Sequence, residues 1–472
     1  MRRIADLRIK GVTCDSKAVK KDFLFVAIKG NQKDGNCFIK EAIINGASYV
    51  IVQAKAKAVK GYANVKFISV KDARKFLGHA CAEFYHHPSN KVKVIGITGT
   101  NGKTTISYLI EAIAAQANYG CGVIGTINHR FKNKVIIAKN TTPGPRQLQE
   151  LLSKMRAQRI KYCAMEVSSH ALDQERVWGI DFACAIFTNL TLDHLDYHKN
   201  LENYFQAKAK LFRKLSSSSI GIINNDDPAA ARLKTLTCAR VMTYGIKNKS
   251  SIMAKDIQYN IKGSQFVLVA RNVKVKINSN LVGRHNIYNL LAAITWGISE
   301  NIAIKNIKSA LEKFKNVPGR LEKVNNKKGY NVFVDYAHTP DALFNIITAL
   351  RFLVKKKIVV IFGCGGQRDK LKRPLMGKVV TELADYAIIT NDNPRSENSL
   401  SIIRDICKGI SKKNFRIIPD RLLAIKEGLA LIDKDDCLVI AGKGHEDYQV
   451  FKNKVRYFND RKAVQKCLRL RK

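Results

Sequence analysis

The heptapeptide GTNGKTT, Gly99–Thr105, contains residue types that bind and transfer phosphate. It follows the apolar run Val92–Thr98 and precedes ISYLIEAIAA, so a strand leads through the loop into a helix, as a phosphate-binding loop requires. The two glycines let backbone N–H groups turn towards phosphate oxygens, and the helix adds its positive N-terminal end. Lys103 would neutralise the outer phosphates, and the hydroxyl of Thr104 would bind Mg²⁺. The loop therefore predicts an ATP-dependent enzyme.

The spacing of this loop leaves a second interpretation open. The common pattern GxxxxGK[ST] is not met, because the residue five places before the second glycine is Ile97. A strand-to-helix turn with a chance GKT is the alternative. Other polar residues favour the phosphate site: Glu166 lies near the end of the run YCAMEV, and Asp193 and His194 lie in TNLTLDHLDYH. A lone Glu or His at a strand end is usually structural, so their role as Mg²⁺ ligands depends on their meeting at one nucleotide site.

Short apolar runs that end in polar or glycine-rich residues recur along the chain and alternate with helical periodicity. Continuous Val/Ile-rich runs of this kind predict buried parallel strands in an α/β protein. Ligands of such sheets bind beyond the carboxyl ends of the strands, where the polar clusters lie. The predicted strands lie within Val92–Thr98, Tyr162–Val167, Phe182–Leu190, Ile220–Asp227, Val332–His338, Lys357–Gly366, Tyr386–Pro394 and Cys437–Glu446.

The chain of 472 residues is long enough for about three domains. A proline and polar residues in Tyr85–Val94, just before the phosphate-loop strand, indicate one boundary. A Pro-Gly break in Asn316–Glu322 indicates another. We therefore expect domains at residues 1–88, 89–318 and 319–472.

The composition predicts a soluble cytoplasmic protein. The N-terminus lacks the apolar stretch of a signal peptide, and no apolar run reaches the roughly 20 residues that span a bilayer. The 11 cysteines are scattered singly without a CxxC pair, which is typical of reduced thiols. A monomer without membrane insertion is expected.

The formal net charge of +44 is unusual and has two interpretations. Clustered Lys and Arg would indicate a nucleic-acid or membrane partner. Here the basic residues are dispersed, with only short runs such as Lys355–Lys357, and no nucleic-acid-binding motif is present. A compositional bias over solvated surfaces is favoured, so no nucleic-acid partner is expected.

Eight motifs in a fixed order connect these features. They are GTNGKTT, EVSSHALDQERV, TNLTLDHLDYH, GRHNIYNLLAA, DYAHTPDAL, FGCGGQRDKLKRPLMG, DNPR and GKGHE. Together they resemble the Mur ligases over about Gly11 to Asp460. The resemblance implies a three-domain α/β fold with a P-loop central domain and a Rossmann-like C-terminal domain. Two features depart from the family: Asn31 stands where a His is often found, and the strong basicity is unlike most members.

The resemblance implies ATP-driven formation of an amide bond. A substrate carboxylate attacks the γ-phosphate to give an acyl phosphate, and an amine then displaces phosphate. The implied small-molecule substrates are UDP-N-acetylmuramoyl-L-alanyl-D-glutamate, bound by the first domain, and meso-diaminopimelate, bound by the third. The product is a peptidoglycan precursor. Repulsion between carboxylate and polyphosphate calls for Mg²⁺ and lysine charges.

The residues that match the family's ATP site and catalytic positions follow from this resemblance. Lys208 matches a lysine that the family carries as a carbamate (N6-carboxylysine). An uncharged amine must react with CO₂, so burial and nearby cations should lower the pKa of Lys208. An ordinary surface lysine is the alternative. The implied catalytic residues are Lys103, Lys208 and His194; the metal ligands are Thr104, Glu166 and His194; the ATP-binding residues are Gly99, Thr100, Asn101, Gly102, Lys103, Thr104, Thr105, Asn286, Arg320 and Asp335.

A set of small polar donors with two cations matches the site for the anionic UDP-sugar peptide. Any one of them could equally be a turn or capping residue. The set comprises Cys14, Ser16, Asn31, Gln32, Lys33, Asn140, Thr141, Thr142, Ser168, Gln174 and Arg176.

The motif DNPR bears on which amino acid is added. Diaminopimelate differs from lysine by a carboxylate at its far end, which a guanidinium grips through two parallel hydrogen bonds. An unpaired buried Arg would penalise L-lysine. A proline turn after a strand is the alternative interpretation. The resemblance assigns diaminopimelate binding to Arg368, Asp392, Asn393, Pro394, Arg395, Gly442 and Glu446.

Two other functions compete. A folylpolyglutamate synthetase would share the phosphate loop but should lack the combination of GCGG…KRP and DNPR. A basic nucleotide-binding protein without catalytic activity gives no reason for the complete set of ligase motifs.

Overall fold

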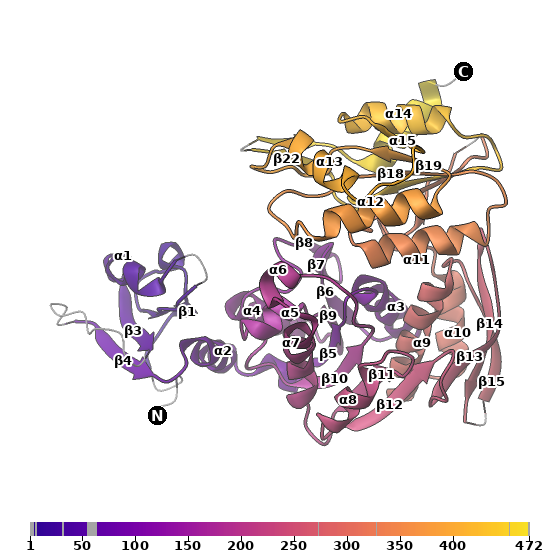
Figure 1. Ribbon diagram of the computed structural model, residues 1–472. Helices are drawn as coiled ribbons and strands as arrows, with labels where there is room; N and C mark the ends of the chain where they lie inside the picture. Colours follow the sequence, from indigo (N-terminus) through magenta and orange to yellow (C-terminus); the bar gives the residue numbers. More distant parts are fainter. Residues whose placement is uncertain are drawn as a thin grey trace.

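Three α/β units follow one another along the chain in this computed structural model (Figure 1). The structure describes residues 4, 7–30, 33–53, 64–271, 273–326, 328–452 and 454–470. The N-terminal unit stands to one side of the central unit, and the C-terminal unit lies on top of it (Figure 1). In the described part of the chain, no helix has both the length and the apolar character that crossing a membrane requires.

The N-terminal unit is a small parallel sheet with strand order β1-β2-β3-β4. Its apolar core forms on both faces of the sheet, so each central strand is buried on both sides. The elements are β1 (Gly11–Thr13), β2 (Phe23–Val26), α1 (Ile39–Ile44), β3 (Ala47–Gln53), β4 (Lys66–Val70) and α2 (Ala73–Phe84).

The central unit is built on a long mixed sheet with the order β15-β14-β13-β12-β11-β10-β5-β9-β6-β7-β8. The middle of the sheet, from β12 through β11, β10, β5 and β9 to β6, is parallel. Antiparallel hairpins flank it on both sides. The bounds are β5 (Lys93–Thr98), β6 (Cys121–Ile124), β7 (Asn128–Phe131), β8 (Lys134–Ile137), β9 (Tyr162–Glu166), β10 (Phe182–Phe187), β11 (Ile220–Asn224), β12 (Arg240–Gly245), β13 (Ile252–Asn260), β14 (Gly263–Ala270) and β15 (Val273–Ser279).

Helices cover both faces of the parallel part of this sheet. Alternate strand residues explain the two layers, since Ile95 and Ile97 point into one apolar core while Val94 points into the other. The first face carries α3 (Lys103–Gln116), α9 (Arg284–Ser299) and α10 (Ile304–Lys313). The second carries α4 (Pro145–Ala157), α5 (Ser169–Asp173), α7 (Leu201–Arg213) and α8 (Ala230–Thr235); the short α6 (Leu195–His198) leads into α7.

The C-terminal unit has a sheet of order β16-β17-β21-β18-β19-β20, parallel except for the β16–β17 pair. Helices α11 to α13 pack on one face, and α14 and α15 pack on the other. The bounds are β16 (Glu322–Lys323), β17 (Asn331–Asp335), α11 (Pro340–Arg351), β18 (Ile358–Phe362), α12 (Lys372–Leu383), β19 (Tyr386–Ile389), α13 (Ser399–Cys407), β20 (Phe415–Ile417), α14 (Arg421–Ala430), β21 (Cys437–Ala441), β22 (Tyr448–Phe451), β23 (Lys454–Tyr457) and α15 (Asp460–Leu470).

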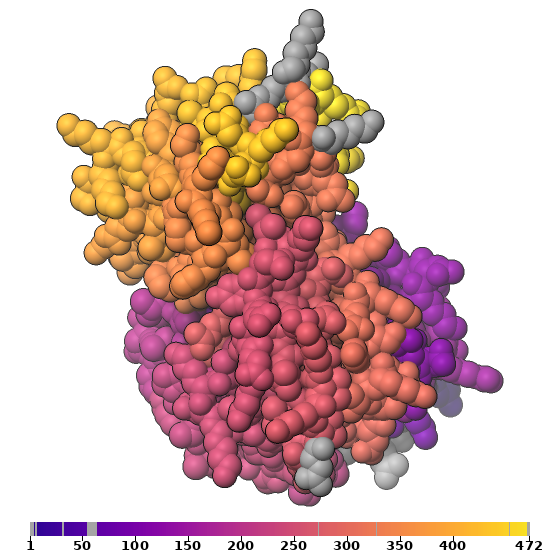
Figure 2. Space-filling view, turned by 90° about the vertical axis from the view of Figure 1, so that its right-hand side faces the viewer, coloured from indigo at the N-terminus to yellow at the C-terminus, as the bar shows by residue number. Residues whose placement is uncertain are grey.

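The β13–β14 hairpin links the central and C-terminal units. Figure 2 is seen from its side and shows the reddish central unit rising against the orange C-terminal unit. Ile261, at the turn of the hairpin, packs on the apolar core of α11 to α13. The two units therefore share apolar contact beyond the chain connection between them.

The seam between the N-terminal and central units is made by α2 and Trp178. A Cβ on Gly78 of α2 would lie 2.7 Å from the Trp178 side chain, so the glycine permits close approach. The ammonium groups of Lys75 and Lys214 lie 4.5 and 4.4 Å from the centroids of the Trp178 ring system. Cation–π contacts from both units therefore hold this indole.

Candidate active site

A cleft of about 1100 Å³ lies between the central and C-terminal units, at the carboxyl ends of their parallel strands. Sequence reasoning predicted that polar clusters would meet at this end, and the lining confirms it. The phosphate loop, the segment from Thr188 to His194, Asp335 and the DNPR motif all contribute residues to the cleft. The cleft thus joins residues from distant parts of the chain.

The phosphate loop needs both of its glycines. Gly99 has φ +141° and Gly102 has φ +92°, which are conformations that L-residues rarely adopt. A Cβ at Gly99 would overlap the hydroxyl of Thr188, and one at Gly102 would overlap the amide oxygen of Asn289. Helix α3 starts at Lys103, so its N-terminal end faces the loop.

A second segment braces the loop from the adjacent strand end. The backbone N–H groups of Thr100 and Asn101 donate to the backbone and side-chain oxygens of Asn189, each at 2.9 Å. The Thr188 hydroxyl donates to the carbonyl of Asn101 at 2.6 Å. Strand β10, which ends just before these residues, pairs with β5 in parallel, and this pairing places the two strand ends together. The motif TNLTLDH therefore holds the shape of the loop.

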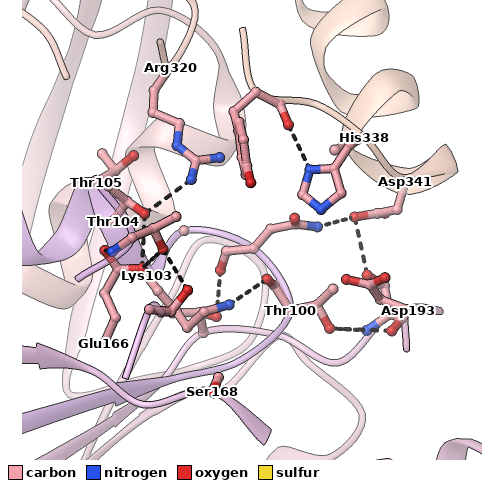
Figure 3. Close-up of a pocket in the computed structure, with 18 of the residues that line it drawn as sticks. Thr100, Lys103, Thr104, Thr105, Glu166, Ser168, Asp193, Arg320, His338 and Asp341 are labelled. Atoms are coloured by element: carbon pink, nitrogen blue, oxygen red, sulfur yellow. Dashed lines mark hydrogen bonds between the residues drawn. The ribbon is translucent and has the colours of Figure 1, made fainter. Parts of the chain in front are cut away.

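Lys103, Thr104 and Glu166 form the polar floor of the cleft (Figure 3). The Lys103 ammonium donates to the carbonyls of Gly99 and Thr100, each at 2.8 Å. Its burial lowers the pKa of Lys103, and the charge of Glu166 acts in the opposite direction. The Thr104 hydroxyl donates to Glu166 Oε2 at 3.0 Å.

The donors at this floor suit a magnesium ion. A Thr hydroxyl and a carboxylate are hard oxygen ligands, and Mg²⁺ bound through few protein ligands keeps waters and substrate phosphates for the rest. Glu166 is 1% exposed and lies 3.0 Å from the Thr104 hydroxyl, so these two predicted ligands meet. Among the described residues, no group of three or more His, Cys, Asp or Glu side chains is arranged to hold a metal unaided.

His194, the third predicted ligand, lines the same cleft beside Asp193. The His194 Nε2 lies 3.4 Å from Asp193 Oδ2, and the ring meets His170 edge to face at 4.8 Å. Burial lowers the pKa of His194, so its imidazole is neutral and keeps a nitrogen lone pair. A neutral imidazole is the form that binds metals.

Lys208 is a core residue and not a surface lysine. It projects from α7, is 1% exposed, and its ammonium donates to the carbonyl of Gly99 at 2.9 Å. Burial, and next the charge of Lys103, lower the pKa of Lys208 well below its usual value. This is the expected direction, and it favours the uncharged amine, the form that reacts with an electrophile such as CO₂.

The three further residues predicted to bind ATP, Asn286, Arg320 and Asp335, all line the cleft, and the side chain of Arg320 reaches across it. Arg320, from the C-terminal unit, donates to the hydroxyl of Thr104 at 3.1 Å (Figure 3). Asp335 accepts backbone N–H groups from Leu321 and Ala337. Its burial raises the pKa of Asp335 to about 6. Asn286 is buried and donates to the carbonyl of Val282 at 2.9 Å.

The residues predicted for diaminopimelate meet in the part of the cleft formed by the C-terminal unit, with one exception. Arg368, Asp392, Asn393, Arg395, Gly442 and Glu446 line it. Arg395 has φ +54° and donates to the carbonyl of Gly366 at 2.7 Å. Pro394 lies behind the wall, where its carbonyl accepts the N–H of Glu397 at 3.1 Å. Pro394 therefore shapes the turn that presents Arg395.

Sequence reasoning missed Lys443, which organises this pocket. Its side chain is 0% exposed and its ammonium donates to Glu446 Oε2 at 3.0 Å and Asn393 Oδ1 at 3.3 Å. The Asn393 amide also donates to Glu446 Oε2 at 2.8 Å. Two donors thus satisfy Oε2 of Glu446, and in the described part of the chain no hydrogen bond to Oε1 is present. The GKGHE motif was a usable signal for Lys443.

Two further contacts were also missed. Thr126 donates to both oxygens of Glu166, from its N–H at 3.0 Å and its hydroxyl at 2.8 Å. Asp341 accepts from the Asn101 amide at 2.7 Å and the Thr191 hydroxyl at 3.3 Å, across the boundary between units (Figure 3). A threonine after a strand and an aspartate in the first turn of a helix are too common to be distinguished in a sequence.

The predicted UDP-sugar residues divide between two units. Asn140, Thr141, Thr142, Ser168 and Arg176 line the cleft, and Gln174 accepts from Arg176 at 2.6 Å. Cys14, Ser16 and Lys33 lie in the N-terminal unit and do not line the cleft; the Ser16 hydroxyl donates to Glu41 at 2.6 Å. Asn31 and Gln32 fall outside the described residues.

Comparison with known families and relatives agrees with this geometry. The Mur ligase family catalytic domain matches residues 8–85, the Mur ligase middle domain matches 97–297, and the Mur ligase glutamate ligase domain matches 319–444. A UDP-N-acetylmuramoyl-L-alanyl-D-glutamate–2,6-diaminopimelate ligase of Clostridium tetani is 42% identical over 98% of this chain and 95% of its own. The Bacillus cereus enzyme of the same name is 40% identical over 98% and 94%.

Solved structures show the same architecture. A UDP-N-acetylmuramoyl-L-alanyl-D-glutamate–2,6-diaminopimelate ligase superposes with a TM-score of 0.70 at 32% identity, covering 98% of this chain and 95% of that one. A folylpolyglutamate synthase of Mycobacterium tuberculosis in complex with ADP has a TM-score of 0.66 at 16% identity over 78% of this chain and 91% of its own, a likeness of fold alone. The three units are thus the three domains of the Mur ligase fold, and the chain belongs to the Mur ligase family.

Proposed function

We propose that this chain is an ATP-dependent ligase that joins meso-diaminopimelate to UDP-N-acetylmuramoyl-L-alanyl-D-glutamate, a step of peptidoglycan precursor synthesis. The observation that carries the proposal is that the phosphate loop and the pocket of Arg368, Arg395 and Glu446 open into one cleft. A transferred phosphoryl group and an incoming amine can therefore reach the same carboxylate. Relatives of about 40% identity that bear this enzyme name support the choice of substrates.

In the first step the D-glutamate side-chain carboxylate attacks the γ-phosphate of ATP, the bond between the γ-phosphorus and the bridging oxygen breaks, and ADP leaves. Lys103 and Arg320 supply positive charge beside the transferring group, where charge accumulates in the transition state. The backbone N–H groups at the N-terminal end of α3 would hold the phosphates, since those of Thr100 and Asn101 already donate to Asn189. Thr104, Glu166 and His194 would hold Mg²⁺, which would neutralise phosphate charge when bound.

In the second step the amine nitrogen of diaminopimelate attacks the acyl carbon, and the bond between that carbon and the phosphate oxygen breaks. Phosphate leaves with the bonding electrons and with the proton that the nitrogen loses. Arg395 and Arg368 would bind the distal carboxylate, and Oε1 of Glu446 would bind the distal ammonium. These contacts position the other amine towards the phosphate loop. L-Lysine lacks the distal carboxylate, so two guanidinium groups would lose their partner.

The test measures ADP release with ATP, Mg²⁺ and each combination of the two acceptor substrates. We expect ADP release to require both the UDP-sugar dipeptide and diaminopimelate, with one amide formed per ADP by mass spectrometry. L-Lysine and L-ornithine serve as comparison amines. ADP release that is independent of any amine would contradict the ligase assignment, whereas equal turnover with L-lysine would contradict only the amino-acid specificity.

We further propose that the enzyme acts in the cytoplasm as a monomer, on small molecules alone. Free thiols at all eleven cysteines, each of them in the described part of the chain, support a reducing compartment. Analytical ultracentrifugation or light scattering measures the mass in solution, and a monomer should give 52.9 kDa.

A further inference from the structure

A buried ion pair lies beneath the amino-acid pocket. Arg421 is the first residue of α14, Asp460 is the first residue of α15, and both side chains are 0% exposed. The guanidinium donates to the carboxylate through two bonds, from Nε to Oδ1 at 2.7 Å and from Nη2 to Oδ2 at 2.8 Å. Neither residue lines the cleft.

The same guanidinium also reaches two backbone carbonyls at strand ends. Its Nη2 donates to the carbonyl of Ala441 at 3.0 Å, and its Nη1 donates to the carbonyl of Asn391 at 3.4 Å. Ala441 is the last residue of β21 and directly precedes Gly442 and Lys443. Asn391 directly precedes the DNPR motif. The pocket has two halves, Asp392–Arg395 and Gly442–Glu446. Arg421 therefore contacts the residue that directly precedes each of them.

The sheet alone does not fix the distance between these two halves. Strands β21 and β19 are not neighbours, because β18 lies between them. Strand β18 ends at Phe362, and the chain beyond it leaves the sheet for Gly363–Gly366. Past that point Arg395 pairs with Phe451 as an isolated parallel bridge, and the Asn393 side chain bonds to Lys443 and Glu446. Beneath these contacts, the guanidinium of Arg421 joins the two strand ends themselves. The side chain of Gln449 in β22 also joins the two sides, because it donates to the carbonyls of Asn391 and Asp392 at 3.3 and 2.9 Å.

We infer that the Arg421–Asp460 pair is a positioning element of the amino-acid pocket, which fixes the two strand ends that carry Asn393 and Arg395 on one side and Gly442 and Glu446 on the other and so contributes to the distance between them. Asp460 fixes the rotation of the guanidinium, and the remaining N–H groups fix the two strand ends. This inference depends on the proposed function, because its measure is the binding of diaminopimelate.

A positioning role and a purely stabilising role predict different effects when the pair is removed. Burying an ion pair costs desolvation that its attraction barely offsets, so apolar replacement of both partners is often neutral for folding. Loss of the carbonyl contacts would instead let the strand ends shift. A misplacement of about 1 Å can cost roughly a hundredfold in rate.

The test compares Arg421→Met/Asp460→Leu and Arg421→Lys with the wild-type enzyme. Both partners are replaced in the first variant so that no charge is left buried alone. In the second, the charge is kept but the planar fork that reaches two carbonyls is lost. We expect both to raise the KM for diaminopimelate roughly ten- to a hundredfold, with the KM values for ATP and the UDP-sugar dipeptide within about twofold and the melting temperature retained.

The matched control is Arg351→Met/Asp385→Leu. That pair joins at 2.6 Å at the amino-terminal end of the same sheet, where Arg351 also donates to the carbonyl of Leu383 and Asp385 accepts from Ile358. We expect its substrate KM values to be unchanged.

Three results would overturn the inference while the wild type turns over with diaminopimelate. One is an unchanged KM for diaminopimelate in both folded variants. Another is a uniform change in all three KM values. The third is unfolding of both variants, which would make the pair a determinant of the fold. A wild type without diaminopimelate-dependent turnover would instead refute the proposed function.

Discussion

The amine of Lys208 lies in surroundings that contain a carbonyl, an aromatic ring and a second lysine. The carbonyl of Gly99 accepts a hydrogen bond from the Lys208 nitrogen at 2.9 Å, and the Tyr204 ring centroid lies 4.0 Å from that nitrogen. These neighbours offer little compensation for a buried charge beside Lys103. A carbamate would reverse the charge and give Lys103 an anionic neighbour. Burial and the charge of Lys103 therefore disfavour the ammonium form of Lys208.

Replacing Lys208 tests this role. For Lys208→Ala we expect kcat to fall roughly 10²- to 10³-fold, the usual effect of losing one charge-stabilising group, with little change in the KM for diaminopimelate. Steady-state kinetics at saturating Mg²⁺ measures both. Partial recovery on adding a short carboxylate such as acetate would support the anionic form.

Lys210 offers the matched control, because it lies two residues further along α7 but its side chain is 35% exposed. Lys210→Ala should keep full activity. Full activity of Lys208→Ala itself would contradict any role of this lysine in catalysis.

Arg395 should affect one substrate selectively. Losing a charge-assisted hydrogen-bond partner costs about 1.5–3 kcal/mol, so Arg395→Ala should raise the KM for diaminopimelate roughly 10- to 150-fold. The KM for ATP should hardly change. Initial rates over a range of each substrate measure this, with the exposed Arg404 of α13 replaced by Ala as the control. An equal rise in both KM values would argue against the pocket assignment.

At the scale of single residues, the sequence reveals those site residues that lie within short, recognisable motifs. Arg395 and Lys103 could be proposed from short motifs, and both line the cleft. Lys443 and Thr126 were not proposed, since their importance arises from contacts to Glu446 and Glu166 that only folding creates. Burial of Lys208 was equally invisible in the sequence: nothing in YFQAKAKLF distinguishes it from Lys210.

At the scale of elements, the helix α11 connects the C-terminal domain to the phosphate loop. Asp341, in its first turn, accepts from Asn101 in the loop and from Thr191 beside it. Arg320 makes a second contact across the boundary, to Thr104. The position of the C-terminal domain is thus linked to the shape of the phosphate loop through a few polar side chains.

Asp341→Ala removes the two hydrogen bonds by which this carboxylate crosses the domain boundary, to Asn101 and Thr191. With about 1.5–3 kcal/mol for a hydrogen bond to a charged group, we expect the domain contact to weaken and kcat to fall roughly tenfold or more. X-ray scattering of the variant should give a larger radius of gyration. Asp341→Asn keeps an acceptor oxygen for both donors and should remain close to the wild type. Unaltered scattering and kcat in the Ala variant would show that the contact has no role in docking.

Elements were predictable where their pattern is local. All eight predicted apolar runs contain parallel strands, within a few residues at their ends. The antiparallel hairpins that flank the central sheet were not predicted. Strand β14 alternates between half-buried and buried residues, and its partners become evident only when β13 and β15 pair with it. The order of strands also depends on long-range packing, which a single sequence does not express.

At the scale of the whole molecule, buried neutral histidines make stability depend on pH. Burial, and next the charge of His170, lower the pKa of His198 from 6.5 to about 4. Between these values the unfolded chain binds a proton that the folded protein does not. The free energy of unfolding therefore decreases as the pH falls from about 6.5 to about 4, and this contribution is fully present only above 6.5.

His198→Gln keeps a group that can bond to the Ser169 hydroxyl, which lies 3.0 Å from the histidine Nε2, but it cannot titrate. Its free energy of unfolding should depend less steeply on pH in this window, by up to about 1.4 kcal/mol per pH unit. Chemical denaturation at several pH values measures the slope. Identical slopes for variant and wild type would show that His198 keeps its ordinary pKa when folded.

The seam at Trp178 has a consequence for observing the enzyme at work. The chain has only two tryptophans, and Trp296 is 0% exposed inside the central core. Trp178 is held between Lys75 of the N-terminal domain and Lys214 of the central domain. Ammonium groups near an indole alter its emission, so movement of the N-terminal domain during substrate capture would appear as a fluorescence change from one known residue. The enzyme thus carries its own optical reporter, and no dye or engineered label is required.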